Sequence, residues 1–179
     1  MHVSIDARAG SCIEWLPQDT IVFDGALADL ETRVELEGDA RYLGWEIVCL
    51  GRTGSGERYA RGECRLRMCI RRDGIPIWLE RGRLKAGERV FSSAAGLDGH
   101  SVFGVLAATM NPGRELLSAC RSIEARSGAA AVTALPGIFV ARYLGDSSEH
   151  ARMFFENVWR ALRPALADRD AVTPRIWRT

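Results

Sequence analysis

The amino-acid sequence predicts a mainly β protein with two α-helices near the C-terminus. Apolar residues recur at every second position through much of residues 1–107, which is the period of strands with one buried face. The period of an amphipathic helix appears only in two later stretches. The chain has 179 residues, the length of one domain, so we expect residues 1–179 to form a single unit.

A β-hairpin centred on Asp73-Gly74 is the clearest local prediction. This dipeptide is preferred in two-residue hairpin turns because both positions adopt positive φ. The strand before it alternates, and its apolar face holds Cys64, Leu66, Met68 and Ile70. A continuous register that starts from Arg72 and Ile75 pairs Ile70 with Ile77, Met68 with Leu79, and Arg67 with Glu80. The hairpin is then apolar on one face and carries a favourable charge pair on the other.

Further strands are predicted on both sides of the hairpin. Their ranges are 1–6, 12–16, 20–23, 30–36, 42–50, 90–93, 101–107, 131–135 and 137–143. Residues 42–50 are apolar at nearly every position, which is typical of a strand covered on both faces. Glu46 is the one carboxylate in that run. It either pairs with a nearby arginine such as Arg52 or faces a polar channel.

Two helices are predicted after residue 110. Asn111 and Pro112 are typical of a helix start, and Gly128 is typical of a helix end. The apolar stripe between them consists of Leu116, Leu117, Cys120 and Ile123. The second helix begins at Asp146 or Ser147, and Pro164 ends or kinks it. It has more apolar side chains than one stripe can hold, so a second apolar surface is available on it.

The sequence lacks the motifs of common enzyme and metal sites. Gly51 to Gly56 has the glycine spacing of a phosphate-binding loop, but Glu57-Arg58 stands where that loop needs Lys and Ser or Thr. We therefore interpret it as a flexible turn. The five scattered cysteines show no CxxC spacing and favour a reduced, cytoplasmic protein. His2, His100 and His150 show no spacing typical of metal ligands, so no metal site is expected. The sequence also lacks the Gly-x-Ser-x-Gly motif of serine hydrolases, and no catalytic residue is expected.

Charge is unevenly distributed along the chain. Residues 1–50 hold ten acidic residues and three arginines, whereas residues 51–90 hold eleven basic residues and five acidic ones. The plainest interpretation is a solvated outer face. An alternative is a β-rich binding module that uses the arginine-rich face of the hairpin for a polyanion. The acidic residues Glu57, Glu63 and Glu80 on or near that face weaken the alternative.

Several separated motifs follow one another along the chain. Upstream are Glu14-Trp15-Leu16-Pro17-Gln18-Asp19-Thr20-Ile21 and then Gly44-Trp45-Glu46, Leu50-Gly51-Arg52 and Gly56-Glu57. Downstream are Pro76-Ile77-Trp78-Leu79-Glu80-Arg81, the stretches 140–145 and 159–164, and Pro174-Arg175-Ile176-Trp177. Taken together, these stretches resemble the signature of the urease accessory protein UreD family, which is called UreH in some species.

The resemblance implies a stacked, β-helix-like fold of antiparallel strands and a non-enzymatic role. Members of the family bind apo-urease and, with UreF- and UreG-type partners, form the complex that delivers nickel to the urease active site. The GTPase of that complex is the UreG partner, which agrees with the absence of a phosphate-binding loop here. Nickel passes transiently through an internal channel, so the resemblance implies no tightly bound cofactor. Neither nucleic acid nor a membrane is implied as a partner.

The resemblance also assigns roles to particular residues. Phe154, Phe155 and Trp159 become candidates for contact with the UreF-type partner, with packing on the β-core as the alternative. Glu46, Arg52 and Glu57 become candidates for a polar channel or for the family signature. Family members normally carry a further β-rich segment before the region matched here. We therefore expect this chain to correspond to their C-terminal two-thirds, as a UreD-like domain truncated on its N-terminal side.

Overall fold

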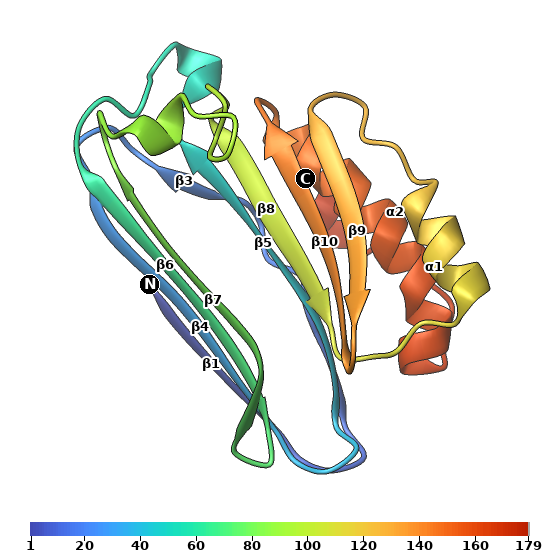
Figure 1. Cartoon of the computed structure of the whole chain (residues 1–179). Coiled ribbons are helices and arrows are strands. Elements are labelled where there is room, and N and C mark those ends of the chain that lie inside the picture. Colours follow the sequence, from blue (N-terminus) through green and yellow to red (C-terminus); the bar gives the residue numbers. More distant parts are fainter. Residues whose placement is uncertain (179) are drawn as a thin grey trace.

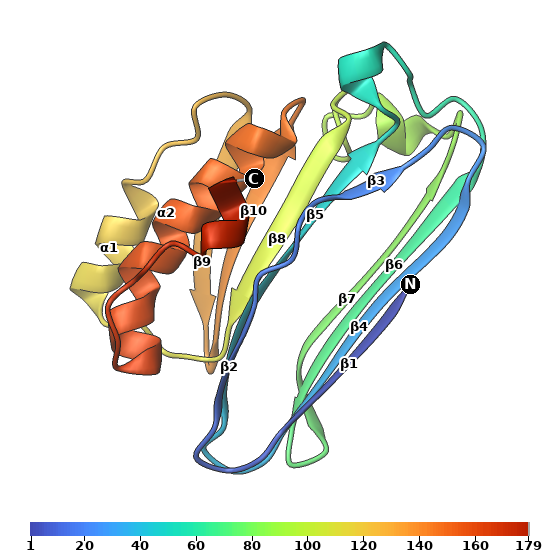
Figure 2. The same ribbon diagram turned by 180° about the vertical axis from the view of Figure 1, so that it is seen from behind.

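Two β-sheets lie face to face, and both α-helices pack on the outer face of one of them. A computed structural model describes residues 1–178, and Figures 1 and 2 show its three layers from opposite sides. The four-stranded sheet has the order β1 (His2–Ala7), β4 (Leu27–Leu36), β6 (Glu63–Arg72) and β7 (Ile75–Lys85). The six-stranded sheet has the order β2 (Cys12–Trp15), β5 (Arg41–Leu50), β8 (Val102–Ala108), β10 (Ile138–Gly145) and β9 (Ala129–Leu135), with β3 (Thr20–Val22) also paired to β5. The helices are α1 (Arg114–Arg121) and α2 (Ser148–Ala167), and three short 3-10 turns are η1 (Thr53–Ser55), η2 (Arg89–Phe91) and η3 (Arg175–Arg178).

The first six strands wind between the two sheets as successive coils. Strands β1, β4 and β6 pair in parallel in one sheet, while β2 and β3 pair in parallel with β5 in the other. His2 pairs with Glu31 and Cys12 pairs with Arg41, so one coil takes 29 residues in both sheets. The next coil is longer because it includes the loop between β5 and β6. This winding is the stacked, β-helix-like arrangement that the resemblance implies.

The remaining strands are antiparallel to their neighbours. Strand β7 returns along β6, β8 lies between β5 and β10, and β9 forms a hairpin with β10. The prediction of a mainly β protein with two helices towards its C-terminal end is therefore confirmed. Both sheets are mixed, however, because the coiled part of the chain pairs its strands in parallel. Among residues 1–178, no helix is both long and apolar enough to cross a membrane.

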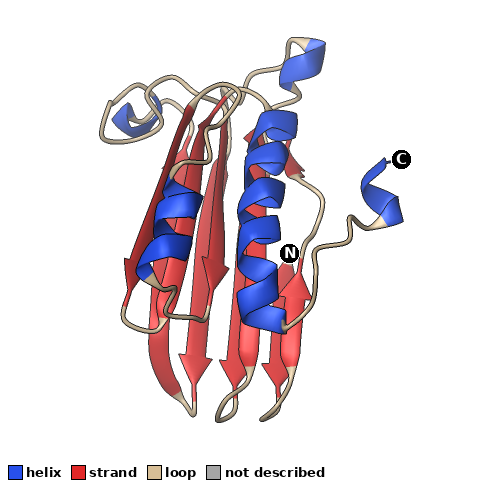
Figure 3. Ribbon diagram, turned by 90° about the vertical axis from the view of Figure 1, so that its right-hand side faces the viewer, coloured by secondary structure: helices blue, strands red, loops and turns tan. Residues whose placement is uncertain are grey.

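Strand β5 is covered on both sides, as its apolar sequence predicts. On one face Trp45 and Ile47 pack in the core beneath the helices. On the other face Tyr42 and Val48 pack against the four-stranded sheet. Figure 3, viewed from the helix side, shows α1 and α2 lying next to each other over the six-stranded sheet. The space between the sheets and the space beneath the helices therefore form two separate apolar layers.

The hairpin of β6 and β7 forms as predicted, but the predicted register is correct only for the first two pairs. Arg72 pairs with Ile75 and Arg71 pairs with Pro76, and a β-bulge then shifts every later pair by one residue. Pro76 has no N–H to donate to the ladder, and proline within sheets is found at edge strands and bulges. The expected pairs Ile70–Ile77, Met68–Leu79 and Arg67–Glu80 are replaced by Ile70–Trp78, Met68–Glu80 and Arg67–Arg81. The shift turns Glu80 towards the other sheet and leaves Leu79 53% exposed on the outside.

Three other local predictions need correction. Residues 90–93 do not form a strand. Val90 and Phe91 belong to the 3-10 turn η2, and their side chains pack against the core from there. Helix α1 starts at Arg114 with Gly113 as its N-cap, while the Asn111 side chain instead accepts a hydrogen bond from the backbone N–H of Gly137 at 2.7 Å. It ends at Arg121, so Gly128 closes no helix, and Ile123 lies beyond it. Helix α2 is capped by Ser147, one of the two predicted starts, and Pro164, which was expected to end or kink the helix, lies inside it and does not end it.

Candidate functional site

Glu46 lies between the two sheets, near the middle of β5. Thr32 of β4 is only 1% exposed and donates its hydroxyl hydrogen bond to the Glu46 carboxylate. Burial raises the pKa of Glu46, the hydrogen bond from Thr32 partly offsets this, and the negative charge of Glu80 adds to the increase. The expected pairing of Glu46 with Arg52 is wrong, because Arg52 binds Glu57 in the loop that follows β5. Glu46 instead faces the interior.

The Glu46 side chain lines a cavity of about 80 Å³ between the sheets. At about 30 Å³ for each molecule of liquid water, this space suits two or three waters or one partly hydrated ion. Its walls come from β5, β6, β7, β8 and β10, and they are mainly apolar. The charged residues that border it are Glu46, Glu80, Arg67, Arg81 and Arg142, and the larger apolar ones include Leu66, Met68 and Phe103. Two carboxylates therefore share one small interior space.

Glu80 is the second carboxylate of this space. Its Oε1 accepts a hydrogen bond from Nη1 of Arg142 at 2.7 Å. Its Oε2 is buried and has no hydrogen-bond partner among the described residues, and the same holds for the indole N–H of Trp78. Buried polar groups are nearly always satisfied, so the unpaired Oε2 of Glu80, which lines the cavity, indicates a place for water or a bound cation, whereas the indole N–H of Trp78 can only donate to an acceptor such as water.

Arg52 and Glu57 hold the loop between β5 and β6 and lie outside this cavity. Arg52 binds Oε2 of Glu57 through Nε at 3.0 Å and Nη2 at 2.7 Å, and the backbone N–H of Asp24 donates to Oε1 at 3.0 Å. The Arg52 hydrogen bond lowers the pKa of Glu57. The structure therefore does not bring Glu57 together with Glu46. Instead, Glu57 ties its own loop to the turn after β3.

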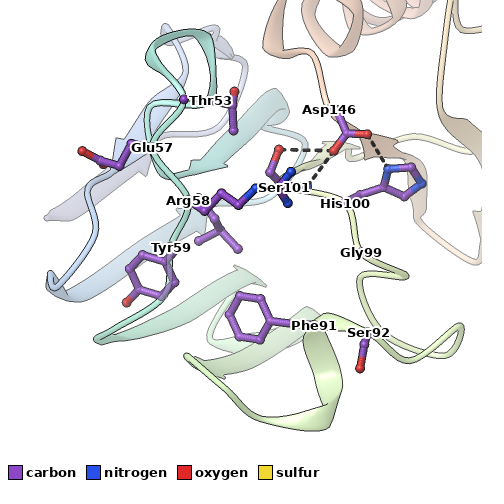
Figure 4. Close-up of a pocket in the computed structure, with 12 residues that line it drawn as sticks. Thr53, Glu57, Arg58, Tyr59, Phe91, Ser92, Gly99, His100, Ser101 and Asp146 are labelled. Atoms are coloured by element: carbon purple, nitrogen blue, oxygen red, sulfur yellow. Dashed lines mark hydrogen bonds and ion pairs between the residues drawn. The ribbon is translucent and has the colours of Figure 1, made fainter.

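A larger, open pocket of about 560 Å³ lies beside that loop, as Figure 4 shows. Nδ1 of His100 lies 2.9 Å from Oδ2 of Asp146, and the backbone N–H of Ser101 donates to Oδ1 at 3.1 Å. Burial opposes ionisation of Asp146, but the hydrogen bonds from His100 and Ser101 outweigh it and lower its pKa. The Ser101 hydroxyl contacts Asp146, not His100, so the three do not form a nucleophile–base pair. Sequence reasoning missed this cluster because 46 residues separate His100 from Asp146.

The aromatic residues proposed for partner contact lie in the core. Phe154, Phe155 and Trp159 are 2%, 0% and 1% exposed and pack between α2 and the six-stranded sheet. Trp159 also donates its indole N–H to Glu14 at 2.6 Å. Of the two alternatives, packing on the β-core is therefore the one the structure shows. Among the large apolar side chains of α2, Met153 is the exposed one, at 40%.

The arginine-rich outer face of the hairpin is largely neutralised by carboxylates. Its ion pairs are Arg65–Glu63, Arg67–Asp29, Arg71–Glu35 and Arg83–Glu63. Such a mixed-charge face gives a polyanion little net positive charge to bind. Within residues 1–178, no three His, Cys, Asp or Glu side chains lie close enough together to hold a metal ion.

Comparison with known proteins identifies the family. The family model described as UreD urease accessory protein matches residues 1–178. The chain belongs to the UreD family. Among UreD relatives, urease accessory protein UreD 2 of Pseudomonas syringae pv. syringae is 47% identical over 179 residues, covering 99% of this chain and 64% of the relative. The UreD protein of Dechloromonas aromatica is 47% identical over 183 residues, with the same two coverages.

The UreD protein of Azoarcus sp. is 48% identical over 171 residues, which cover 95% of this chain and 60% of the relative. The chain therefore spans somewhat less than two thirds of the length of the UreD relatives it matches. The matched family is one of accessory proteins, which agrees with the expected non-enzymatic role.

Proposed function

We propose that this chain acts in urease maturation as a non-enzymatic scaffold. Membership in the UreD family supports a maturation role, since the relatives are named urease accessory proteins. In the proposal, the chain binds apo-urease together with UreF- and UreG-type proteins in the cytoplasm. Ni²⁺ is the cargo of this assembly and not a resident cofactor of the chain.

The cavity between the sheets carries the proposal. Glu46 and Glu80 offer carboxylate oxygens, which are ligands for divalent cations, inside mainly apolar walls. Among residues 1–178 no third ligand joins these two carboxylates, so they would bind a cation weakly enough to release it again. That property suits a protein that passes a metal ion on. The pair of Arg52 and Glu57 supports the adjoining loop and is not part of the proposed lining.

The exposed faces of α1 and α2 are the surface we propose for the UreF-type partner. Phe154, Phe155 and Trp159 lie beneath α2, so in this proposal they hold the helix in place and do not touch the partner. Met153 is a large apolar residue that α2 exposes. Replacing Met153 by Asp should therefore weaken partner binding without unfolding the chain.

The test is urease activation in cells that carry urease and the other accessory proteins but no UreD. The full-length P. syringae relative is the positive control, and Arg71→Gln, on the outer face of the hairpin, is the matched variant control. We expect Glu46→Gln to lower both the nickel content and the activity of purified urease while the chain still co-purifies with the UreF-type partner. If Glu46→Gln leaves the nickel content unchanged, the cavity is not the route. If the chain fails to co-purify with any of the partners that the relative captures, the scaffold role is wrong.

A further inference from the structure

Glu80 and Leu79 occupy places opposite to those that burial favours. Without the bulge at Ile77, Leu79 would face the other sheet and Glu80 would face solvent. With it, the leucine is 53% exposed and the carboxylate lines an interior cavity. Bulges often re-aim a side chain next to a functional site. The same shift buries Leu84, which is 6% exposed, and keeps Arg81 and Arg83 on the outer face, so core packing accounts for the shift and the inward carboxylate comes with it.

Arg142 provides the partner of this carboxylate from the opposite sheet. Its guanidinium binds Glu80 at 2.7 Å and lies 5.8 Å from the centre of the Trp78 ring. Within residues 1–178, this is the one salt bridge that directly joins a strand of the four-stranded sheet to a strand of the six-stranded sheet. The Arg142 side chain is 50% exposed and that of Glu80 is 28% exposed, so the pair lies where the cavity approaches the surface between β7 and β10.

We propose that Arg142 and Glu80 form a gate that controls how a divalent cation reaches the cavity at Glu46. In the closed arrangement, the guanidinium neutralises Glu80 and presents a positive charge to any approaching cation. A divalent ion and a guanidinium repel each other, so the ion can take Glu80 only when Arg142 moves away. The Trp78 ring is already beside the guanidinium and can retain it by a cation–π contact. The inference rests on the function proposed above and specifies its control.

The test measures access to position 46 directly. The whole chain carries Glu46→Cys, and the introduced thiol reacts with a small cationic methanethiosulfonate, followed peptide by peptide with mass spectrometry. We expect Arg142→Ala to accelerate this labelling at least about tenfold, Arg142→Lys to restore slow labelling, and Arg71→Ala to have no effect. Cys64 and Cys120 are fully buried and report any general loosening of the fold in the same sample.

Two outcomes would overturn the gate. One is an unchanged labelling rate in Arg142→Ala, and the other is a parallel rise at Cys64 and Cys120, which would mean that the variant merely loosens the fold. If Glu46→Cys does not fold, stopped-flow association of Ni²⁺ with the Arg142→Ala and Arg142→Lys chains replaces labelling, and equal rates reject the gate. The urease assay of Glu46→Gln is independent of both, so the gate can fail while the proposed function stands.

Discussion

Truncation of Phe155 separates a core role from a partner-binding role for the aromatic residues of α2. Its ring is fully buried, with its centre 6.3 Å from that of Trp45 and 5.5 Å from that of Phe154. Replacing such a phenylalanine by alanine costs about 3–5 kcal/mol of unfolding free energy. For a domain of this size, each kcal/mol lowers the melting temperature by about 2–4 °C. We therefore expect Phe155→Ala to lower it by roughly 6–20 °C.

Gly104 of β8 tests the same packing from the opposite side. A Cβ at this position would lie 2.7 Å from Cε2 of Phe155 and 2.8 Å from the backbone oxygen of Glu46. Gly104→Ala alone should cost about 1–3 kcal/mol through overpacking. In the double variant, the space left by Phe155 relieves one of the two clashes. The destabilisation of the double variant should therefore be smaller than the sum of the destabilisations of the two single variants.

Urea unfolding followed by circular dichroism, on the parent, both single variants and the double variant, measures this coupling. The reasoning is refuted if Phe155→Ala unfolds at the same urea concentration as the parent. It is also refuted if the two changes are simply additive. Loss of partner binding at unchanged stability would instead assign Phe155 to a contact surface.

Two further predictions concern Glu46 and the start of α2. Because burial raises the pKa of Glu46 above its ordinary value of 4.5, the folded chain keeps a proton that the unfolded chain releases as pH rises, so this group destabilises the fold at neutral pH. Glu46→Gln should therefore raise the melting temperature at pH 7.5 and change it little at pH 4; a fall at pH 7.5 would contradict the buried site. The Ser147 hydroxyl accepts a hydrogen bond from the backbone N–H of His150 at 3.2 Å. Ser147→Ala should therefore lower the free energy of unfolding, measured in urea, by about 1 kcal/mol. Ser147→Asp should lower it much less, because aspartate also caps a helix.

Much of the strand layout could be predicted, because alternation records which face of a strand is buried. In β4, the alternating residues Leu30, Thr32, Val34 and Leu36 are all buried. The direction of pairing could not be predicted in this way. A strand with one buried face looks the same whether its neighbour runs parallel or antiparallel, and the parallel partner here lies 29 residues away. The predicted helix start at Asn111 was wrong because its side chain, which was expected to cap the helix, accepts a tertiary hydrogen bond from Gly137 instead.

Only part of the candidate site could be predicted from the sequence. Glu46 could be singled out because it is the lone carboxylate in an apolar strand. Glu80 could not, because it belongs to an ordinary-looking charged strand and faces inward only after the shift at Ile77. Pro76 was the available signal, since a proline inside a hairpin strand makes a bulge more probable. Arg142 became recognisable only when the two sheets were seen together.

The coiled winding of the first six strands bears on how the chain folds. The hairpins β6–β7 and β9–β10 close across turns of two residues, so their first contacts are local. Strand β1 meets β4, and β2 meets β5, only after the chain has completed a circuit of 29 residues. Closing a long loop costs chain entropy before any stabilising contact has formed, and this slows folding. We expect the two hairpins to form early, while β4 stays unpaired until a completed circuit brings β1 or β6 beside it, and during that interval its open edges are the part of the chain most exposed to mispairing.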